Sequence, residues 1–266
     1  MTRHNRQRRM GLFLLGAILA ASIFAPLLSR HDPDAITTPA EKRFMAPSSA
    51  HWFGTDQFGR DLFARVLHGG RVSLLIALAV VAGAVTFGAL YGALSGYFGG
   101  WWDHLLMRVV DALLAFPLVF LAVTLMAIFG TGLKWLIIIL IFGSWMDIAR
   151  LVRAEVLSLK QRPFIVKARA AGLKTSRILF HHLLPNTFAT ILAAAILRVA
   201  DVILIESALS FLGLGAQPPT ASWGAILSDG KAVLASAWWI TAFPGLAIVI
   251  TVLSINLIGE GLRQRD

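Results

Sequence analysis

The hydrophobic and polar positions of this chain are arranged in long blocks, without the short alternation of a half-buried strand. Most apolar blocks approach or exceed the roughly 20 residues that a helix needs to cross a bilayer. Unbroken apolar blocks favour membrane helices over a transmembrane barrel, whose strands alternate polar and apolar side chains. The pattern predicts an all-α, polytopic membrane protein with six transmembrane helices, at residues 10–28, 72–94, 105–129, 133–148, 188–205 and 239–258.

The first apolar block follows a basic N-terminus, residues 1–9, that contains several arginines. A basic start with an apolar middle also describes a signal peptide. Residues 10–28 are long enough to span a bilayer, however, and no small-x-small cleavage pattern ends them. We therefore expect residues 10–28 to be the first transmembrane helix, with the N-terminus in the cytoplasm.

The distribution of basic residues predicts the topology. From Arg150 to Arg177 the chain carries many Lys and Arg side chains, and Glu155 is the only acid among them. Loops rich in Lys and Arg stay on the cytoplasmic side of a membrane. We therefore expect residues 151–186 and both termini to be cytoplasmic. The outer side would hold residues 29–71 and 207–238, and residues 72–266 would form a permease core of five transmembrane helices.

The composition supports the membrane class and excludes several functions. Hydrophobic residues make up 57% of the chain and charged residues 14%, against about 25% charged residues in soluble domains. Basic membrane loops account for the net charge of +10, so we do not infer nucleic-acid binding. The chain has no cysteine for thiol chemistry or Cys-based metal sites. It also lacks the GxxxxGK[ST], HExxH and GxSxG motifs, so it has no P-loop for hydrolysing ATP.

The segment FIVKARAAGLKTSRILFHHLLP interrupts the hydrophobic pattern between the fourth and fifth blocks. The Ala-rich stretch Phe164–Ala171 predicts a short helix, and Gly172 predicts its end, with the positive φ that glycine adopts easily. Thr175 or Ser176 is expected to cap a second short helix, which Pro185 would end. Two interpretations remain open from spacing alone. The segment is either a solvated cytoplasmic loop that is basic because of the positive-inside rule, or a docking element that another protein contacts and moves.

A second polar motif, GTDQFGRD, precedes the second block. Asp61 is expected near the start of a helix, where its charge suits the helix dipole. Asp56, Arg60, Asp61 and Arg65 could form a local charge network. A metal or catalytic role for Asp56 and Asp61 is the alternative, although their five-residue spacing is weak support for it.

Within the spans, sequence features predict packing and possible transport roles. The second block is rich in glycine, including Gly83, Gly88 and Gly92, so a neighbouring helix can approach it closely. Pro117 is expected to kink the third span. Charged residues inside membrane helices are costly and usually face a bundle interior or a cavity. Four such residues were identified, at Asp111, Arg198, Asp201 and Glu206.

Arg198 and Asp201 are three residues apart, so they can pair on one helix face. Such a pair either fixes helix packing or lines a transport path. An ion relay through Asp111, Arg198 and Asp201 would instead indicate an ion-coupled secondary transporter, a different class of membrane protein.

Several motifs, in the right order over nearly the whole chain, resemble the C-type membrane subunit of the dipeptide/oligopeptide/nickel class of ABC importers. The N-terminal signature GTDxxGRD is matched by Gly54, Thr55, Asp56, Gly59, Arg60 and Asp61. The other motifs are MRVVDALLAFP from Met107, FLGLG from Phe211, WGAIL from Trp223 and FPGLAIVITVLSINLIGEGLR from Phe243. This resemblance implies a type I ABC importer permease fold.

The resemblance also implies that the basic segment is the family's coupling motif, an EAA-type helix that docks into a groove on an ATP-binding subunit. Val166 and Lys167 stand where the family usually has Glu-Ala, which leaves the exact polar contacts undetermined. The residues expected to couple to the ATPase are Phe164, Val166, Lys167, Ala168, Arg169, Ala171, Gly172, Leu184 and Pro185.

The function implied by this resemblance is that of a non-enzymatic permease subunit in the cytoplasmic membrane of a prokaryote, working by alternating access. Its expected partners are a second, related permease subunit, two ATP-binding subunits that hold ATP and Mg²⁺, an extracytoplasmic substrate-binding protein and the lipid bilayer. Di- or oligopeptides are the first candidates for the substrate. Nickel, haem or another solute are the alternatives.

Overall fold

The computed structural model describes residues 3–36 and 42–263, and this part of the chain is helical with a single isolated β-bridge, Thr55–Asp61. The α-helices are α1 (Arg3–Ile23), α2 (Ala25–Leu28), α3 (Leu62–Phe98), α4 (Gly100–Leu114), α5 (Leu118–Phe129), α6 (Leu133–Leu159), α7 (Pro163–Ala170), α8 (Thr175–Arg177), α9 (Leu184–Phe211), α10 (Trp223–Gly230) and α11 (Trp239–Arg263). A π-helical stretch, Ile178–Leu183, joins α8 to α9, and a short 3-10 turn, Lys231–Val233, follows α10.

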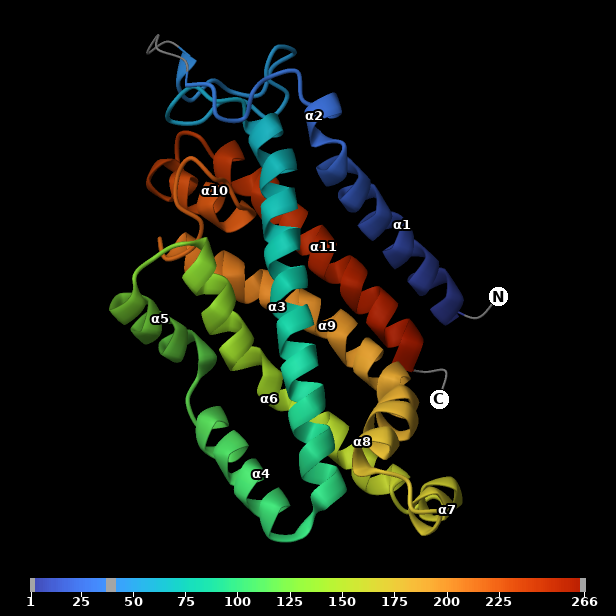
Figure 1. Ribbon diagram of the computed structural model, residues 1–266. Coiled ribbons are helices and arrows are strands. Elements are labelled where there is room, and N and C mark those ends of the chain that lie inside the picture. The colour runs from blue at the N-terminus through green and yellow to red at the C-terminus, as the bar shows by residue number, and fades with distance from the viewer. Residues whose placement is uncertain (1–2, 37–41, 264–266) are drawn as a thin grey trace.

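Helix α3 is the central element and runs the length of the molecule (Figure 1). Its 37 residues correspond to about 55 Å, well beyond the roughly 30 Å hydrocarbon core of a bilayer. It packs most extensively against α6 and then against α9, whereas α1 packs along α11. Because α3 is longer than the membrane is thick, it connects the polar loops at the two ends of the bundle.

The glycines of α3 allow the close approach that their positions predicted. A Cβ atom on Gly88 would lie 2.5 Å from the carbonyl oxygen of Trp145, and one on Gly83 would lie 2.7 Å from the Cδ1 atom of Ile141. Both neighbours belong to α6, so α3 and α6 pack closely along a stripe of small residues.

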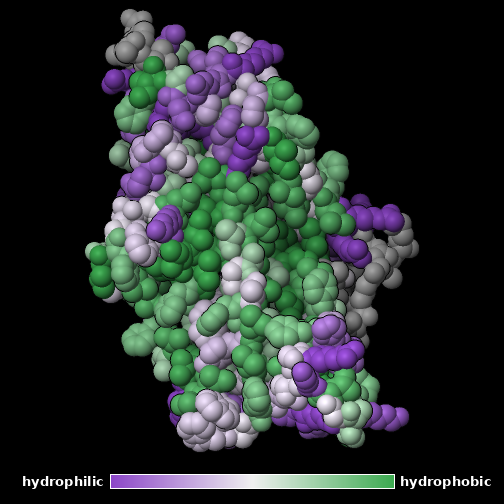
Figure 2. Space-filling view, in the orientation of Figure 1, coloured by the Kyte–Doolittle hydropathy of each residue, from purple (hydrophilic) through white to green (hydrophobic). Residues whose placement is uncertain are grey.

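Four described helices, α3, α6, α9 with the turns before it, and α11, are long and apolar enough to cross a membrane, and a fifth span results if α4 and α5 are counted together. Large apolar side chains such as Leu75, Phe120 and Val249 are exposed on these elements. Figure 2 shows that apolar surface covers the middle of this face, with polar residues gathered toward the ends. The protein is therefore a multi-pass membrane protein. The span predicted at residues 10–28, which corresponds to the latter part of α1 with α2, stays a prediction.

The third predicted span differs from the structure. In place of one kinked helix, α4 and α5 meet at 82° across a break, and Pro117 is the residue before α5. The pyrrolidine ring of Pro117 offers no N–H, and it disfavours a helical conformation for the residue before it. The helix therefore ends before this proline, and a new one begins after it.

Pro185 does not end a helix, contrary to the sequence-based expectation. It lies in the first turn of α9, where a proline costs no intrahelical hydrogen bond. The chain is helical without a break from Thr175 to Phe211. The cap of α8 also differs from expectation, because the N-cap is Lys174 and neither Thr175 nor Ser176 caps with its side chain.

Candidate functional site at the loop between α6 and α9

The basic segment predicted as a docking element forms a helical loop at one end of the bundle, with α7 projecting beyond α6 and α9 (Figure 1). Pro163 occupies the first turn of α7 after the extended residue Arg162, an arrangement that starts a helix without losing a hydrogen bond. The loop lies opposite the end that carries the start of α3 (Figure 1). It is therefore placed to contact a partner outside the membrane-spanning part.

The end of α7 has the geometry that Gly172 predicted. Gly172 has a φ of +74°, and its N–H donates to the Arg169 carbonyl oxygen at 2.9 Å. The N–H of Leu173 donates to the Ala168 carbonyl oxygen at 3.2 Å, which completes a Schellman motif. The predicted positive φ of Gly172 is thus confirmed. The motif fixes the angle at which the chain leaves α7 toward the next helix.

The inward side of α7 is anchored by one residue. Ile165 is fully buried and packs in a cluster with Ile178, Leu179 and Leu183 of the following turns. Val156 of α6 belongs to the same cluster. Burying an isoleucine side chain of this kind stabilises by about 1.5–3 kcal/mol, so α7 is held as a rigid part of the bundle end.

Polar contacts connect the loop and the end of α6 to the end of α3 and to α4. The guanidinium of Arg169 lies 4.7 Å from the ring centroid of Tyr97, a cation–π contact. The Lys160 Nζ atom donates to the carbonyl oxygen of Gly96 at 2.8 Å. Arg153 on α6 makes a two-pronged ion pair with Asp103 of α4, at 2.5 and 2.6 Å. These basic residues therefore make specific structural contacts, so the positive-inside rule is not the only reason for their presence.

Two large apolar side chains of α7 are exposed, one on each flank of the buried Ile165, and basic residues lie next to them. Phe164 and Val166 are 43% and 53% exposed, and Lys167 next to them is exposed as well. Of the nine residues predicted to couple to an ATPase, two are half-buried, Ala168 and Leu184, and seven are exposed: Phe164, Val166, Lys167, Arg169, Ala171, Gly172 and Pro185. Exposed apolar side chains on a rigid element are suited to protein contact.

The GTDQFGRD motif lies at the opposite end of the molecule and is built around one carboxylate. Asp56 accepts hydrogen bonds from the backbone N–H groups of Phe58 and Arg60 at 2.8 and 3.0 Å, and its other oxygen is 2.6 Å from the Arg60 Nε atom. Gly54 and Gly59 have φ angles of +79° and +71°, so the turn depends on their lack of a side chain.

The predicted charge network exists, but Asp229 belongs to it in place of Asp61. The Arg65 Nε atom lies 3.5 Å from Asp56, and both Arg60 and Arg65 lie 3.5 Å from an oxygen of Asp229 in α10. Burial raises the pKa of the Asp229 carboxyl, and the charges of Arg65 and Arg60 oppose this shift. Sequence reasoning missed Asp229 because it is far away in the chain. The network joins the motif to α10.

Asp61 takes no part in that network. One of its oxygens accepts the backbone N–H of Ala64 at 2.8 Å and so caps α3, as expected for a residue at a helix start. Its other oxygen lies 2.8 Å from the Nδ1 atom of His51. Asp56 is paired with Arg60 and Arg65, so the structure does not bring Asp56 and Asp61 together as a metal or catalytic pair.

The intramembrane charged residues fall into separate groups. Arg198 lies 3.8 Å from Asp201, within ion-pair distance as predicted, but its shorter contact is to Asp147 on α6. The side chains of Asp147 and Asp201 are 51% and 57% exposed, whereas that of Arg198 is 18% exposed. Asp111 pairs with Arg150 at 2.5 Å, and both are about half exposed.

Glu206 is the deeply buried member, with 0% exposure. Its carboxyl oxygens accept hydrogen bonds from the hydroxyls of Ser210 at 2.7 Å and Ser73 at 3.2 Å. Ser73 also accepts the backbone N–H of Trp223 at 3.1 Å. The group thereby joins α9, α3 and α10. Its hydrogen-bond partners differ from the partners of Asp111 and Arg198, so Glu206 belongs to a separate group.

Comparison with known proteins agrees with this arrangement. Residues 84–265 match the family described as the binding-protein-dependent transport system inner membrane component. The dipeptide transport system permease protein DppC of Alkalihalophilus pseudofirmus is 43% identical over 98% of this chain and 85% of its own length. The oligopeptide transport system permease protein OppC of Bacillus subtilis is 39% identical, with the same coverage of each chain.

A solved structure shares the fold. The methionine ABC transporter MetNI, in an inward-facing conformation, contains a chain that superposes with a TM-score of 0.59 over 76% of this chain and 96% of its own length. The sequence identity is 19%, so this likeness concerns the fold alone.

The chain belongs to the family of inner membrane components of binding-protein-dependent transport systems, which are the permease subunits of ABC importers. Its fold is that of a type I ABC importer permease, as the motifs predicted. Within the family it groups with the dipeptide and oligopeptide permeases, to which it is similar over almost its whole length.

Proposed function

We propose that this chain is one of two related permease subunits of an ATP-driven importer of di- or oligopeptides. The peptide substrate rests on the similarity to peptide permeases from two organisms, at 43% and 39% identity over nearly the full chain. Nickel, haem or another solute would use the same architecture with different contacts in the transport path.

The observation that carries this proposal is the exposed face of α7. Phe164 and Val166 present exposed apolar side chains on a helix that Ile165, which lies between them in sequence, anchors to the bundle. A rigid helix with exposed apolar side chains is suited to enter a groove on a partner and to pass movement into the bundle. We propose that this partner is one of two ATP-binding subunits, which would hold ATP and Mg²⁺. This chain has no P-loop of its own.

The proposed orientation places the α7 loop and both termini in the cytoplasm. The basic residues between Arg150 and Arg177 support this side by the positive-inside rule. The GTDQFGRD motif and α10 would then face the outer side, where a substrate-binding protein delivers its cargo. Transport would follow alternating access, in which closure of the ATPases favours one of two arrangements of the helix bundles.

Reconstitution tests the proposal. The chain, its partner permease and the two ATP-binding subunits are inserted in proteoliposomes, and ATP hydrolysis and uptake of a labelled dipeptide are measured with and without the binding protein. We expect uptake that requires ATP and the binding protein, together with stimulated hydrolysis. Uptake driven by a proton or sodium gradient without ATP would contradict the proposal and indicate a secondary transporter.

A further inference from the structure

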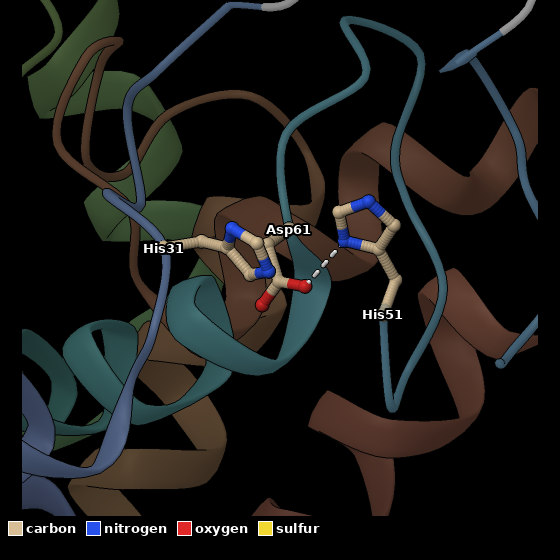
Figure 3. A group of neighbouring side chains, drawn as sticks. All are labelled: His31, His51 and Asp61. Carbon is tan, nitrogen blue, oxygen red and sulfur yellow. Dashed lines mark hydrogen bonds and ion pairs between the residues drawn. The ribbon is translucent and has the colours of Figure 1, made fainter. Parts of the chain in front are cut away.

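Two histidines and one aspartate lie together at the end of the bundle where α3 begins (Figure 3). His31 follows α2, His51 belongs to the segment that leads to α3, and Asp61 is the N-cap of α3. One potential ligand atom from each residue lies within 4.8 Å of the other two. The cluster thus brings together three chain positions that are well separated in sequence.

The carboxylate of this cluster is held in a fixed orientation. Asp61 is 5% exposed, and the N–H of Ala64 donates to one of its oxygens at 2.8 Å. The remaining oxygen points toward the imidazole of His51, whose Nδ1 atom is 2.8 Å away (Figure 3). Hydrogen bonds of this kind orient metal-binding carboxylates in known sites.

The second histidine completes the cluster from the solvent side. The rings of His31 and His51 are 4.9 Å apart between centroids, and His31 is exposed. The Nε2 atom of His31 lies 3.2 Å from the carbonyl oxygen of Ala50, which leaves its Nδ1 atom available as a ligand. Figure 3 shows the His31 ring beside the Asp61 carboxylate, on the side away from His51.

We propose that His31, His51 and Asp61 bind one divalent transition-metal ion, with Zn²⁺ as the first candidate. Two imidazole nitrogens with one carboxylate suit Zn²⁺ and its neighbours, whereas Mg²⁺ and Ca²⁺ prefer oxygen ligands. The neutral imidazoles supply affinity, and the single carboxylate supplies the negative charge. The interaction between His51 and Asp61 is then the arrangement of the metal-free form.

The distances require a small movement. At metal–ligand distances near 2.1 Å, ligand atoms around a tetrahedral Zn²⁺ are about 3.4 Å apart. The cluster, with ligand atoms within 4.8 Å of one another, has to contract by about 1.4 Å at most. His31 can supply this movement because it lies in an exposed segment outside the helices.

A small cavity beside the cluster offers room for a fourth ligand. Its volume is about 20 Å³, and His31 and Asp61 line it together with Arg30 and Trp52. This volume is enough for one water molecule, the usual fourth ligand of a three-residue zinc site. The guanidinium of Arg30 lies over the ring of Trp52 at 5.7 Å, and its charge opposes a cation, so we expect moderate affinity.

Metal titration of the full-length chain tests the site. The chain is purified without a polyhistidine tag, and Zn²⁺ binding is measured by calorimetry. Co²⁺ binding is followed by its visible absorption, which reports coordination geometry. We expect one Zn²⁺ per chain with a Kd on the order of micromolar at pH 7.5, and weaker binding as the pH falls, because protons compete with the metal for its ligands.

Variants separate the proposed site from other histidines. His31→Ala and His51→Ala should each weaken Zn²⁺ binding at least tenfold. Asp61→Asn should do the same while preserving the cap of α3, because asparagine is an equally good N-cap. His68→Ala is the matched control, since His68 lies outside the cluster and bonds to the Ala64 carbonyl oxygen of its own helix at 2.9 Å.

A second control uses the adjacent histidines of the α7–α9 loop, His181 and His182. Their double alanine variant should retain the bound metal and the cobalt spectrum. The proposal is overturned if the wild-type chain binds no Zn²⁺, or if binding survives unchanged in the His31→Ala and His51→Ala variants. Loss of the metal in the double variant at 181 and 182 would overturn it as well.

Discussion

A Cβ atom on Gly92 would lie 2.2 Å from the carbonyl oxygen of Ala149, closer than any real side chain can approach. Gly92 lies in the C-terminal third of α3 and Ala149 is in α6, and by this measure Gly92 approaches the α6 backbone more closely than Gly88 does. Gly96, one turn further along, is 2.9 Å from the carbonyl oxygen of Arg153 by the same measure. The spacing of small residues therefore determines how near α6 comes to α3.

We expect Gly92→Ala to destabilise the bundle by about 1–3 kcal/mol, because the added methyl group forces the two helices apart. Thermal unfolding of the purified chain in detergent measures the effect. Gly16→Ala is the control, since a Cβ atom there meets nothing within 4 Å. Equal melting temperatures for both variants would show that α3 and α6 are not in backbone contact.

The side of the membrane on which the α7 loop lies can be tested with single cysteines, because the chain has none of its own. Thr175 and Ser49 are both exposed, one in the α7–α9 loop and one in the segment before α3. An impermeant thiol reagent added to intact cells should label Ser49→Cys and leave Thr175→Cys unlabelled until the cells are opened. Labelling of Thr175→Cys in intact cells would refute the proposed orientation.

Gly172→Val should uncouple the ATPases without preventing membrane insertion. A Cβ atom at this position meets nothing within 4 Å, so the damage comes from the φ of +74° alone. A left-handed conformation costs an L-residue about 1–2 kcal/mol, which favours a different exit from α7. Copurification of the subunits, followed by a stimulated ATPase assay in lipid, measures the effect.

Gly172→Asn is the matched control, because asparagine tolerates a positive φ, and it should retain most of the stimulated hydrolysis. Ala168→Glu should also weaken ATPase binding, since a large charged side chain would hold the helix out of its groove. Normal assembly and normal stimulated ATP hydrolysis in both the Gly172→Val and the Ala168→Glu variants would refute the assignment of this loop as the coupling element.

Arg198 should interact more strongly with Asp147 than with Asp201. Its contact to Asp147 is the shorter of the two, and that with Asp201 is 3.8 Å. Double-mutant cycles with Arg198→Ala and each aspartate, read out as the yield of the assembled complex, compare the two. Coupling to Asp201 alone would contradict the observed geometry.

Asp229→Asn should change how stability depends on pH. Burial raises the pKa of this carboxyl, so its contribution to stability is fully present below the unfolded pKa, near 4, and is lost as pH rises through the folded pKa. The asparagine cannot titrate, so the melting temperature of the variant relative to that of the wild type should increase as pH rises from about 4. A difference in melting temperature between the variant and the wild type that stays constant with pH would contradict this prediction.

Local features of the fold were predictable where a single short-range rule decides. The glycine stripe of α3 and the positive φ of Gly172 follow from residue size and backbone freedom, and both expectations agree with the structure. Pro117 shows the limit of such rules. A proline predicts an interruption, but whether the helix bends or breaks by 82° depends on what the two halves pack against.

Long-range partners were not predictable from spacing. The Asp56 turn is readable from its own sequence, but Asp229, which meets Arg60 and Arg65, is supplied by α10 far along the chain. Asp147 was missed for the same reason, because only tertiary packing brings α6 beside Arg198 on α9. Pro185 was misinterpreted because the π-helical turn before it lets the chain remain helical through the proline.

Helix α3 begins at the Asp61 cap and ends at Tyr97 and Phe98, beside the contact that Arg169 makes from the α7 loop. A single rod of about 55 Å therefore runs from the segment before α3 to the base of α7. A tilt of about 5° about its midpoint would displace each end by about 2.4 Å in opposite directions. Helix α3 would thus act as a lever. A small movement of α7 would displace one end of α3, and the other end would move the GTDQFGRD motif and its contact to α10.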